Sequence, residues 1–340
     1  MKGLPAGAAL LLIGCVPGCG GCSPAAPAEG MSPVVEAGAT AADARSAPVT
    51  EDSLRALLAE LPPYRSIGTA EHAATRDWIV ARLRGLGYAP RLQPFEWAGR
   101  PGAELANIEL VVPGEAADTP LVLLSAHYDS VRATPGADDN GSGTVALLEL
   151  ARRLGGGGFP RELRLLWFDA EEPGLLGSGA WLEALPAADA RRVVGLINLE
   201  TLGYTDRRPG SQRLPEGVDL VFDPGDRGDF LLCLGNLASA ALAKVVDDAL
   251  SAEESPVFRV ETFAFLPGTG LVLPDSRRSD HSQFWDRGLS AVLLTDTAFL
   301  RSPHYHAPSD TLETLDLAFL ASAVHGVERA ARVLLGEGGR

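Results

Sequence analysis

Four separate stretches of this sequence place acidic or imidazole side chains after an apolar run or in a short loop. The residues concerned are His127 and Asp129, Glu171 and Glu172, Glu200, and His304 with His306. Each one alone has an ordinary interpretation as a helix cap or a solvated charge. Histidines combined with several carboxylates suit a hard or borderline divalent metal ion, and the four stretches together therefore indicate a metal site.

The stretch 125–143, SAHYDSVRATPGADDNGSG, is the centre of this pattern. The apolar run 121–124 in front of it is typical of a buried parallel strand. His127 and Asp129 are two residues apart, so their side chains leave the end of that strand on the same side. Since active sites of open α/β sheets lie at the carboxyl ends of strands, we expect the site here.

Strand and helix patterns alternate along the chain without an internal repeat. Strands are predicted over 91–97, 106–112, 121–127, 163–168, 193–199, 230–234, 257–263 and 291–295. Helices are predicted over 51–61, 71–86, 144–154, 176–185, 238–250 and 315–335. The alternation predicts one α/β domain, a three-layer sandwich in which helices flank a central, mostly parallel mixed sheet. Residues 205–228, rich in Gly, Pro, Asp and Arg, are expected to cross the surface without regular structure.

The composition is that of an ordinary globular domain. Of the 340 residues, 46% are hydrophobic and 21% charged, which is enough apolar material for a core. The formal net charge of −15 argues against a nucleic acid partner, because binding phosphates needs a surplus of Lys and Arg. No apolar run reaches the length of a membrane-spanning helix.

The first residues indicate export. Residues 1–22 carry one lysine, a short apolar segment and then small residues, as in a secretory signal peptide. Its Leu-Ile-Gly-Cys sequence resembles a bacterial lipobox and predicts a lipoprotein anchored at Cys15; a plain cleavable signal is the alternative. Residues 23–50, rich in Ala and Pro, are expected to form a disordered tether to a domain over 51–340. Cys233 lies in an apolar run and is expected to be buried and unpaired.

Six motifs of the chain resemble those of one enzyme family. They are HYDS, PGADDNGSG, DAEEPGLLGS, NLETLGY, SDHSQFW and HYHAPSDT, which occur in this order within a resemblance that covers about residues 50–335. Motifs of this kind and order are found in the secreted di-zinc aminopeptidases of the bacterial leucyl-aminopeptidase type, to which glutamate carboxypeptidase and the glutaminyl cyclases are related. The resemblance implies a zinc-dependent exopeptidase that cleaves peptides with a metal-activated hydroxide.

The resemblance also implies how two zinc ions are held. It assigns His127 and Glu200 to the first ion, Glu172 and His306 to the second, and Asp139 to both as a bridge. The three anionic ligands and a bridging hydroxide balance the four positive charges of the ions, which explains how so many carboxylates are tolerated at one place. The family further implies a cis peptide bond after the bridging acid, between Asp139 and Asn140.

Further roles are implied around these ligands. The resemblance implies that Glu171 is the general base, and this agrees with the different directions in which adjacent side chains point, since one carboxylate can then bind metal while its neighbour handles protons. Asp129 and Asp310 are expected to orient the two histidine ligands. The adjacent pair Asp280 and His281 is expected to support the pocket without binding metal; either Ser279 or Asp280 capping a helix is the ordinary alternative.

In one respect the chain departs from the family. Relatives often place a tyrosine before the SDH motif to stabilise the oxyanion, but no tyrosine occurs between Thr262 and Ser279. Arg277 or Arg278 could replace it, or zinc alone could suffice.

Three functions remain open at this stage. The leading hypothesis is a monomeric aminopeptidase with peptide substrates, outside the cytoplasm and attached to a membrane only through a lipid. The second is a carboxypeptidase or a glutaminyl-cyclase-like acyl transferase on the same fold. The third is a catalytically silent binding ectodomain, which the complete ligand set argues against.

Overall fold

The computed structural model describes residues 45–337. The predicted signal peptide, the lipid-anchor position Cys15 and most of the predicted tether lie outside these described residues. Within them, no helix is long and apolar enough to cross a membrane.

Residues 45–50, predicted as the end of the tether, instead lie against the domain. Val49 is only 3% exposed and belongs to the main core. Arg153 donates hydrogen bonds to backbone carbonyls of this segment, among them that of Ser46 at 2.8 Å. Thr50 then caps the first described long helix by accepting from the backbone NH of Ser53. Residues 45–50 are therefore held against the domain both by the buried side chain of Val49 and by the hydrogen bonds from Arg153.

The helices and strands follow the predicted alternation. The helices are α2 (Glu51–Glu60), α3 (Ala70–Gly85), α4 (Gly143–Leu154), α5 (Leu176–Ala184), α6 (Ala187–Ala190), α7 (Ala240–Ser251), α8 (His281–Asp286) and α9 (Leu317–Leu334). The strands are β1 (Arg91–Phe95), β2 (Leu105–Val112), β3 (Leu121–His127), β4 (Glu162–Phe168), β5 (Val193–Glu200), β6 (Leu231–Asn236), β7 (Val260–Leu266) and β8 (Ala291–Thr295). The short helices α6 and α8 were not predicted, because four to six residues show too little periodicity.

All eight strands form one mixed sheet in the order β1-β2-β4-β3-β5-β8-β6-β7. The pairs β4–β3, β3–β5, β5–β8 and β6–β7 are parallel, while β1–β2, β2–β4 and β8–β6 are antiparallel. The predicted mostly parallel mixed sheet is thus confirmed. Its centre is parallel, and the carboxyl ends of β4, β3, β5 and β8 meet at one edge.

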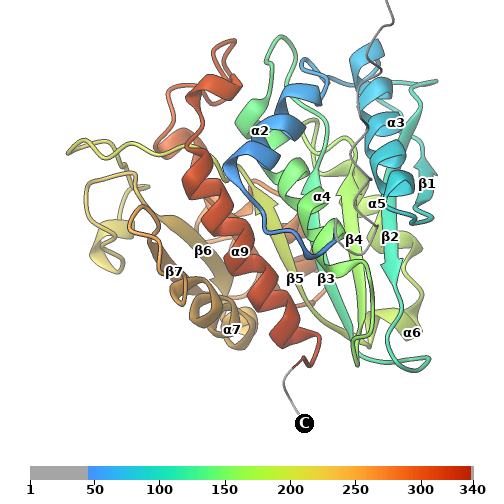
Figure 1. Ribbon diagram of the computed structural model, residues 1–340. Helices are drawn as coiled ribbons and strands as arrows, with labels where there is room; N and C mark the ends of the chain where they lie inside the picture. Colours follow the sequence, from blue (N-terminus) through green and yellow to red (C-terminus); the bar gives the residue numbers. More distant parts are fainter. Residues whose placement is uncertain (1–44, 338–340) are drawn as a thin grey trace, which may run out of the picture. The chain divides into compact units, whose positions relative to one another are not determined.

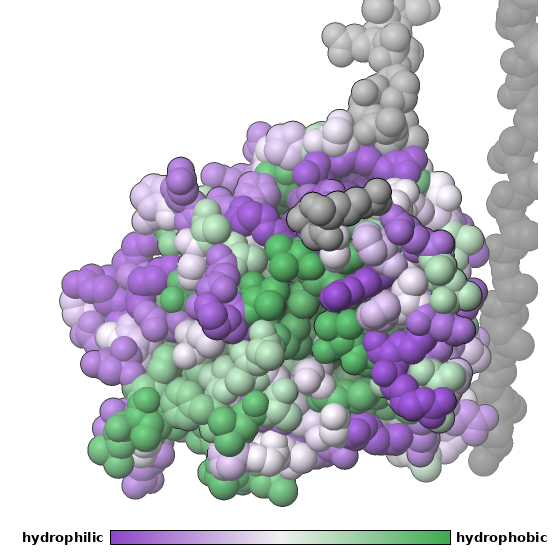
Figure 2. Space-filling model, turned by 90° about the horizontal axis from the view of Figure 1, so that it is seen from below, coloured by the Kyte–Doolittle hydropathy of each residue, from purple (hydrophilic) through white to green (hydrophobic). Residues whose placement is uncertain are grey.

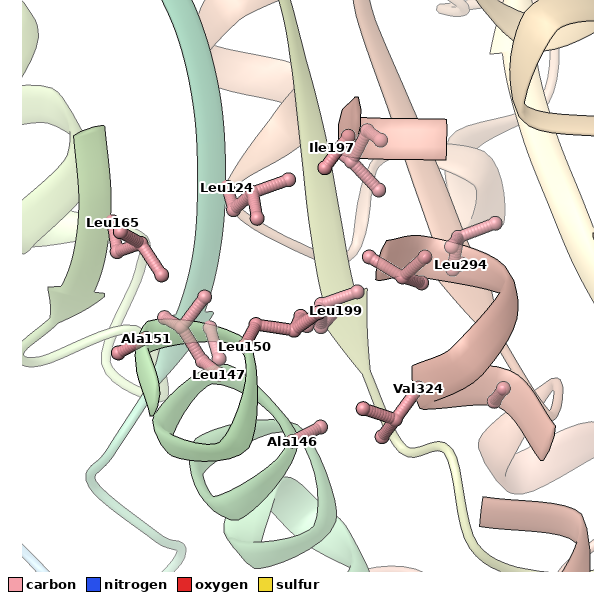
Figure 3. Close-up of a cluster of buried hydrophobic side chains, with 14 of the residues drawn as sticks. Leu124, Ala146, Leu147, Leu150, Ala151, Leu165, Ile197, Leu199, Leu294 and Val324 are labelled. Atoms are coloured by element: carbon pink, nitrogen blue, oxygen red, sulfur yellow. The ribbon is translucent and has the colours of Figure 1, made fainter. Parts of the chain in front are cut away.

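Strand β3 lies between the two layers of helices, and all seven of its residues are buried. Val122 and Leu124 point into one core, while Leu121 and Leu123 point into the other. This period of two explains why its sequence is a continuous apolar run. Figure 3 shows Leu124 beside Leu147 and Leu150 of α4 in the larger core.

The helices cover the two faces of the sheet unequally. In Figure 1, α2, α4, α7 and α9 lie in front of the strands, and their apolar side chains share the larger core. Helices α5 and α8 supply Trp181 and Trp285 to the smaller core on the opposite face. Cys233 is buried and free, as predicted. The three-layer sandwich is therefore confirmed for the part of the chain that the structure describes.

The lower face of the domain, in the orientation of Figure 1, carries exposed apolar side chains. Figure 2 shows them gathered toward the lower left, the side on which β6, β7 and α7 lie in Figure 1. Large side chains exposed in and after these strands include Leu237, Phe265, Leu271 and Val272. Because β6 runs antiparallel to β8, the carboxyl ends of these two strands lie at opposite edges of the sheet. The strand ends that carry the predicted metal ligands meet at the edge where β8 ends.

Candidate metal centre

Three neighbouring strands deliver the first part of the site. His127 is the last residue of β3, Glu200 is the last residue of β5, and the loop after β4 carries Glu171 and Glu172. Since β4, β3 and β5 are adjacent and parallel, their carboxyl ends lie side by side. Asp139 arrives on the turn in front of α4, and His306 on the loop in front of α9.

These side chains form two groups of potential metal ligands. One group contains His127, Glu171 and Glu200, and the other contains Asp139, Glu172 and His306. In each group the donor atoms lie within 4.8 Å of one another. All six residues that were assigned to the two zinc ions and to the general base therefore converge at one place.

Asp139 lies between the two groups. Its Oδ1 is 3.4 Å from Nε2 of His127, and its Oδ2 is 3.0 Å from Nε2 of His306. The remaining carboxylates complete each side, with Glu200 Oε1 3.3 Å from His127 Nε2 and Glu172 Oε2 3.4 Å from His306 Nε2. One carboxylate that faces a histidine with each of its oxygens has the geometry of a bridging ligand.

The backbone around Asp139 is held by side chains that come from distant parts of the chain. The peptide bond between Asp139 and Asn140 is cis, as predicted. The side-chain amide of Asn140 donates to the carbonyl of Leu199 at 2.8 Å and accepts from the backbone NH of Thr201 at 3.2 Å. This links the turn to the end of β5, so Asp139 and Glu200 are positioned together.

Asp310 supports the site in a different way from the one predicted. It was expected to orient His306, but its two oxygens accept hydrogen bonds from the backbone NH groups of Asp138 and Asp139, at 2.8 and 3.1 Å. His306 is instead placed by its left-handed backbone, with φ of 55°, and by its ring, which stacks on that of Tyr305 at 3.8 Å. The prediction failed because the groups that donate to Asp310 are backbone amides. Nearly every residue has such an amide, so the residue types in a sequence do not show which ones are bonded.

Asp129 orients the first histidine and also holds the loop after β4. Its Oδ1 is 3.3 Å from Nδ1 of His127 and accepts from the backbone NH of Glu171 at 3.0 Å. Its Oδ2 accepts from the backbone NH of Glu172 at 3.2 Å. One buried carboxylate thus fixes a ligand from β3 relative to two side chains from the loop after β4.

The charges of the cluster explain its titration behaviour in the absence of metal. Burial, and then the charge of Asp139, raise the pKa of Glu172 to about 7. Burial also raises the pKa of Glu171 and of Glu200. Burial disfavours the charged form of His306, but its hydrogen bonds with Asp139 and Glu172 outweigh this and raise its pKa to about 10. The buried carboxylates therefore need positive charge beside them. Either protonated histidines or bound metal ions can supply it.

The donor set fits zinc. Each side offers one imidazole nitrogen together with carboxylate oxygens, and zinc binds both kinds of atom in proteins. Moreover, Oε1 of Glu172 is buried without any hydrogen-bond partner, although an unpaired charged oxygen is costly to bury. A cation between Glu172 and His306 would satisfy that oxygen.

Asp280 and His281 lie beside this cluster without joining either group. Asp280 is the residue in front of α8 but makes no side-chain cap hydrogen bond, so the helix-cap alternative is wrong for it. Burial raises its pKa to about 7, and His127 and Glu200 are near enough to influence it. His281 directs Nε2 to the carbonyl of Ser276 at 2.8 Å, and Ser279 donates to Glu200 Oε2 at 2.8 Å.

Three buried features of the site were not predicted. Arg65, only 1% exposed, donates to the backbone carbonyls of Tyr128 and Gly136, at the two ends of the loop in front of the turn that carries Asp139. Asp169, in front of the Glu171 loop, is 2.7 Å from Nε2 of His72 and accepts from the hydroxyl of Tyr128 at 2.7 Å. Both features join segments far apart in sequence.

The third feature involves Asp138, the first acid of the pair in the PGADD motif. Its Oδ1 accepts from the backbone NH of Gly203 at 2.8 Å. Burial and the neighbouring carboxyl of Asp296 raise the pKa of Asp138 well above its usual value. Only the acidic pair itself was visible in the sequence.

A pocket with a cavity volume of about 100 Å³ opens beside Glu200. Most of its wall is apolar, and its lining includes Leu214, Val218, Phe222, Phe230, Leu232, Leu234, Phe263, Leu273, Leu293, Phe299 and Tyr305. Part of the wall comes from the predicted irregular segment 205–228, which therefore contributes to the site. Among the charged residues of the lining is Arg278, whereas Arg277 does not line the pocket.

A model described as Peptidase family M28 matches residues 107–230. An uncharacterized protein of Escherichia coli, YfbL, is 38% identical over 221 residues, which are 62% of this chain and 66% of that protein. Aminopeptidase YwaD of Bacillus subtilis is 45% identical over 83 residues, 24% of this chain and 18% of the relative. The chain thus matches less than two thirds of the length of each of these relatives.

Solved structures show the same fold. The zinc aminopeptidase BSAP of Bacillus subtilis superposes with a TM-score of 0.66 at 18% identity. The match covers 84% of this chain and 95% of that protein, including strands outside the range of the family model.

Proposed function

Because this chain belongs to peptidase family M28, we propose that it is a zinc-dependent aminopeptidase, a hydrolase that removes residues from the N-termini of peptides. The proposal depends above all on one observation, the position of Asp139 between two groups of ligands that each contain a histidine. It is further supported by the name of the relative YwaD and by the fold shared with a zinc aminopeptidase.

Five side chains would hold two zinc ions. His127 and Glu200 would bind one, Glu172 and His306 the other, and Asp139 would bind both. Bound zinc polarises a carbonyl group and makes an activated water available at neutral pH. We propose two zinc ions because each of the two groups has a complete set of donors, whereas an enzyme with a single metal ion needs only one such set.

Glu171 is the proposed general base. Its carboxylate lies with the imidazole of His127 and the carboxylate of Glu200 but is not needed to complete either ligand set. It would take a proton from water and deliver it to the leaving amine. Burial raises its pKa above the usual value, which brings a carboxylate closer to the range in which it can both accept and release a proton near neutral pH.

The apolar pocket indicates the substrate. It opens beside Glu200, so a residue whose carbonyl lies at the metal site can place its side chain in the pocket. Since the wall is formed largely by Leu and Phe side chains, we propose that the enzyme prefers peptides with a large apolar first residue. A charged first residue would lose its hydration there without finding a partner on most of the wall.

The place of action and the assembly are part of the same proposal. We propose that the protein is exported and acts outside the cytoplasm as a monomer, attached by a lipid at Cys15 or released after cleavage of the signal. Lipid attachment is tested by detergent extraction of wild type and Cys15→Ser from membranes, since only the wild type should remain membrane-bound.

The activity is tested with a panel of aminoacyl 4-nitroanilides, the same compounds acetylated at the amine, and a glutaminyl peptide. An aminopeptidase should cleave the free leucyl and phenylalanyl compounds and spare the acetylated ones. Cleavage of N-blocked peptides from the carboxyl end would indicate a carboxypeptidase, and loss of ammonia from the glutaminyl peptide a cyclase. No turnover with zinc bound would favour a silent binding domain.

A further inference from the structure

A groove with a cavity volume of about 270 Å³ borders the ligand cluster through Glu172. The apolar pocket borders the cluster through Glu200, and the pocket and the groove share no lining residue. Glu172 and Glu200 belong to different ligand groups, and Asp139 lies between those groups. A peptide bond held over Asp139, with its first side chain in the apolar pocket, therefore directs the residue after that bond toward the groove.

Two exposed arginines give this groove a positive charge. Arg132 lies in the loop after β3 and Arg100 in the connection between β1 and β2, and both line the groove. Within residues 45–337, neither side chain pairs with a carboxylate, and that of Arg132 makes no hydrogen bond. Since the whole chain carries a formal net charge of −15, two arginines without acidic partners at one groove are a local exception, and they suit an anionic ligand.

The backbone at the edge of the groove holds Arg100 in place. Its guanidinium donates to the carbonyl of Ile67. It also lies against Gly68, where an added Cβ atom would collide with it. Gly68 has a φ of 77°, which glycine adopts without strain, so this one residue serves both the turn and the close approach of the arginine. A guanidinium has several N–H donors, and one bond to a carbonyl leaves most of them for a ligand.

The carboxylates in the wall of the groove have other partners. Asp129 accepts hydrogen bonds from the backbone NH groups of Glu171 and Glu172, at 3.0 and 3.2 Å. Its Oδ1 is also 3.3 Å from Nδ1 of His127. Glu172 would hold zinc under the proposed function. Since both negative charges are offset in this way, the arginines determine the charge that the groove accepts, and the ammonium group of a substrate is repelled from it.

We propose that this groove binds a carboxylate carried by the residue after the scissile bond, with Arg100 and Arg132 as its partners. The inference rests on the proposed function and adds a preference at the second position of the substrate. The carboxylate can belong to an Asp or Glu side chain or to the chain end of a dipeptide, because both offer an arginine the same pair of oxygens. Ile67 and Trp97 also line the groove and offer apolar surface to the stem of such a residue.

Peptides that differ only at the second position test this preference. We expect the zinc-loaded wild type to cleave Leu-Glu-Ala amide with a kcat/KM about 5- to 25-fold above that for Leu-Gln-Ala amide, since each of two exposed ion pairs contributes up to about 5-fold. Leu-Lys-Ala amide should be the poorest substrate of the three. Most of the difference should lie in KM, because the carboxylate is held alike before and during the reaction.

The chain end is tested by comparing the dipeptide Leu-Ala with its amide. A higher kcat/KM for the free acid would show that the groove accepts a terminal carboxylate, and an advantage of Leu-Glu-Ala amide would show that it accepts a side chain. Either result supports the inference. Equal rates within both pairs would overturn it and leave the proposed function standing. If the zinc-loaded wild type cleaved none of these peptides, the proposed function would be wrong, and the inference with it.

Substitutions assign the preference to the two arginines. Arg100→Gln and Arg132→Gln should each lower the ratio of kcat/KM between the Glu and Gln peptides, and the double variant should bring this ratio to about 1. Arg132→Glu should make the Lys peptide a better substrate than the Glu peptide, a reversal that mere damage to the groove would not produce.

Arg84→Gln is the matched control. Arg84 is exposed on α3 and lines neither the groove nor the apolar pocket, so the ratio in this variant should equal that of the wild type. A wild-type ratio in the double variant of Arg100 and Arg132 would overturn the inference, because another part of the protein would then be the source of the preference.

Discussion

The carboxylate of Asp310 accepts a hydrogen bond from the backbone NH of Asp139, at 3.1 Å and across 171 positions of the chain. Its other oxygen accepts from the NH of Asp138 at 2.8 Å, so both oxygens bind the turn that presents the bridging carboxylate. Asp310 is 1% exposed and makes no direct contact with the carboxylate that it helps to place. We therefore expect metal binding to depend on Asp310, which lies in the loop in front of α9 and is not one of the proposed ligands.

This arrangement predicts the effect of Asp310→Asn. An amide keeps the shape but has one acceptor oxygen, and its NH2 group faces a backbone donor. We expect zinc affinity to fall by about 10- to 100-fold, as is common when a group supporting a ligand is lost. Competition with a chelator of known affinity measures the change. Ser309→Ala, which alters the neighbouring residue and its bond to His304, should bind zinc normally; wild-type affinity in Asp310→Asn would contradict the prediction.

The adjacent acids Glu171 and Glu172 should respond differently to the same substitution. Glu171→Gln removes the proposed base but no ligand, so turnover should fall by about 10²- to 10⁴-fold while the zinc content stays that of the wild type. Glu172→Gln replaces an anionic ligand by a neutral amide and should lose one zinc ion on mild dialysis. Parallel elemental analysis and assays measure both effects. If Glu171→Gln kept near-normal activity, or lost zinc as readily as Glu172→Gln, the assignment of base and ligand would be wrong.

Removing the metal should abolish activity and lower thermal stability together. Without cations the buried carboxylates of Asp139, Glu172 and Glu200 repel one another, and only protons can neutralise them. Zinc at 100 times its Kd should stabilise the fold by about 2.7 kcal/mol for each site. Calorimetry before and after chelation measures this shift, and titration of zinc back into the protein should restore activity at two equivalents. Full activity at one equivalent would refute the two-ion site.

His281 predicts a pH dependence of stability. Burial lowers its pKa from 6.5 to about 4, so the folded protein takes up this proton only near pH 4, while the unfolded chain takes it up near pH 6.5. Between these values the unfolded state binds more protons, and the stability that His281 contributes is lost as the pH falls from 6.5 to 4, by roughly 3 kcal/mol in all. At pH 7 this contribution is fully present.

The comparison uses His281→Gln, which can still donate to the carbonyl of Ser276. Guanidinium unfolding of both proteins, free of metal, should show the wild type losing stability relative to the variant between pH 6.5 and 4. Since both proteins keep Asp280, its own titration cancels in the difference. A constant difference across this range would show that His281 titrates alike in the folded and unfolded states.

Much of the fold and of the ligand set followed from the sequence alone. Strand β3 was found as an unbroken apolar run because both of its faces are buried, and His127 and Asp129 were placed together because two residues make one period of a strand. Glu200 stood out for a similar reason, as a charge at the end of a strand too apolar to be exposed. The resemblance to a known family supplied the pairing of ligands and the cis bond after Asp139, which periodicity does not reveal.

Other features were decided only by the tertiary structure. Asp310 accepts from backbone amides of the turn that carries Asp139, Arg65 donates to carbonyls of the loop in front of that turn, and Tyr305 lines the pocket together with Glu200. Patterns in a sequence report residue type and local period, so they find a strand end and the charged residue that it carries. They do not report which backbone groups of one loop face which side chain of another. That depends on how several irregular loops fold over the same edge of the sheet, where contacts join positions such as 139 and 310 and no periodicity relates them.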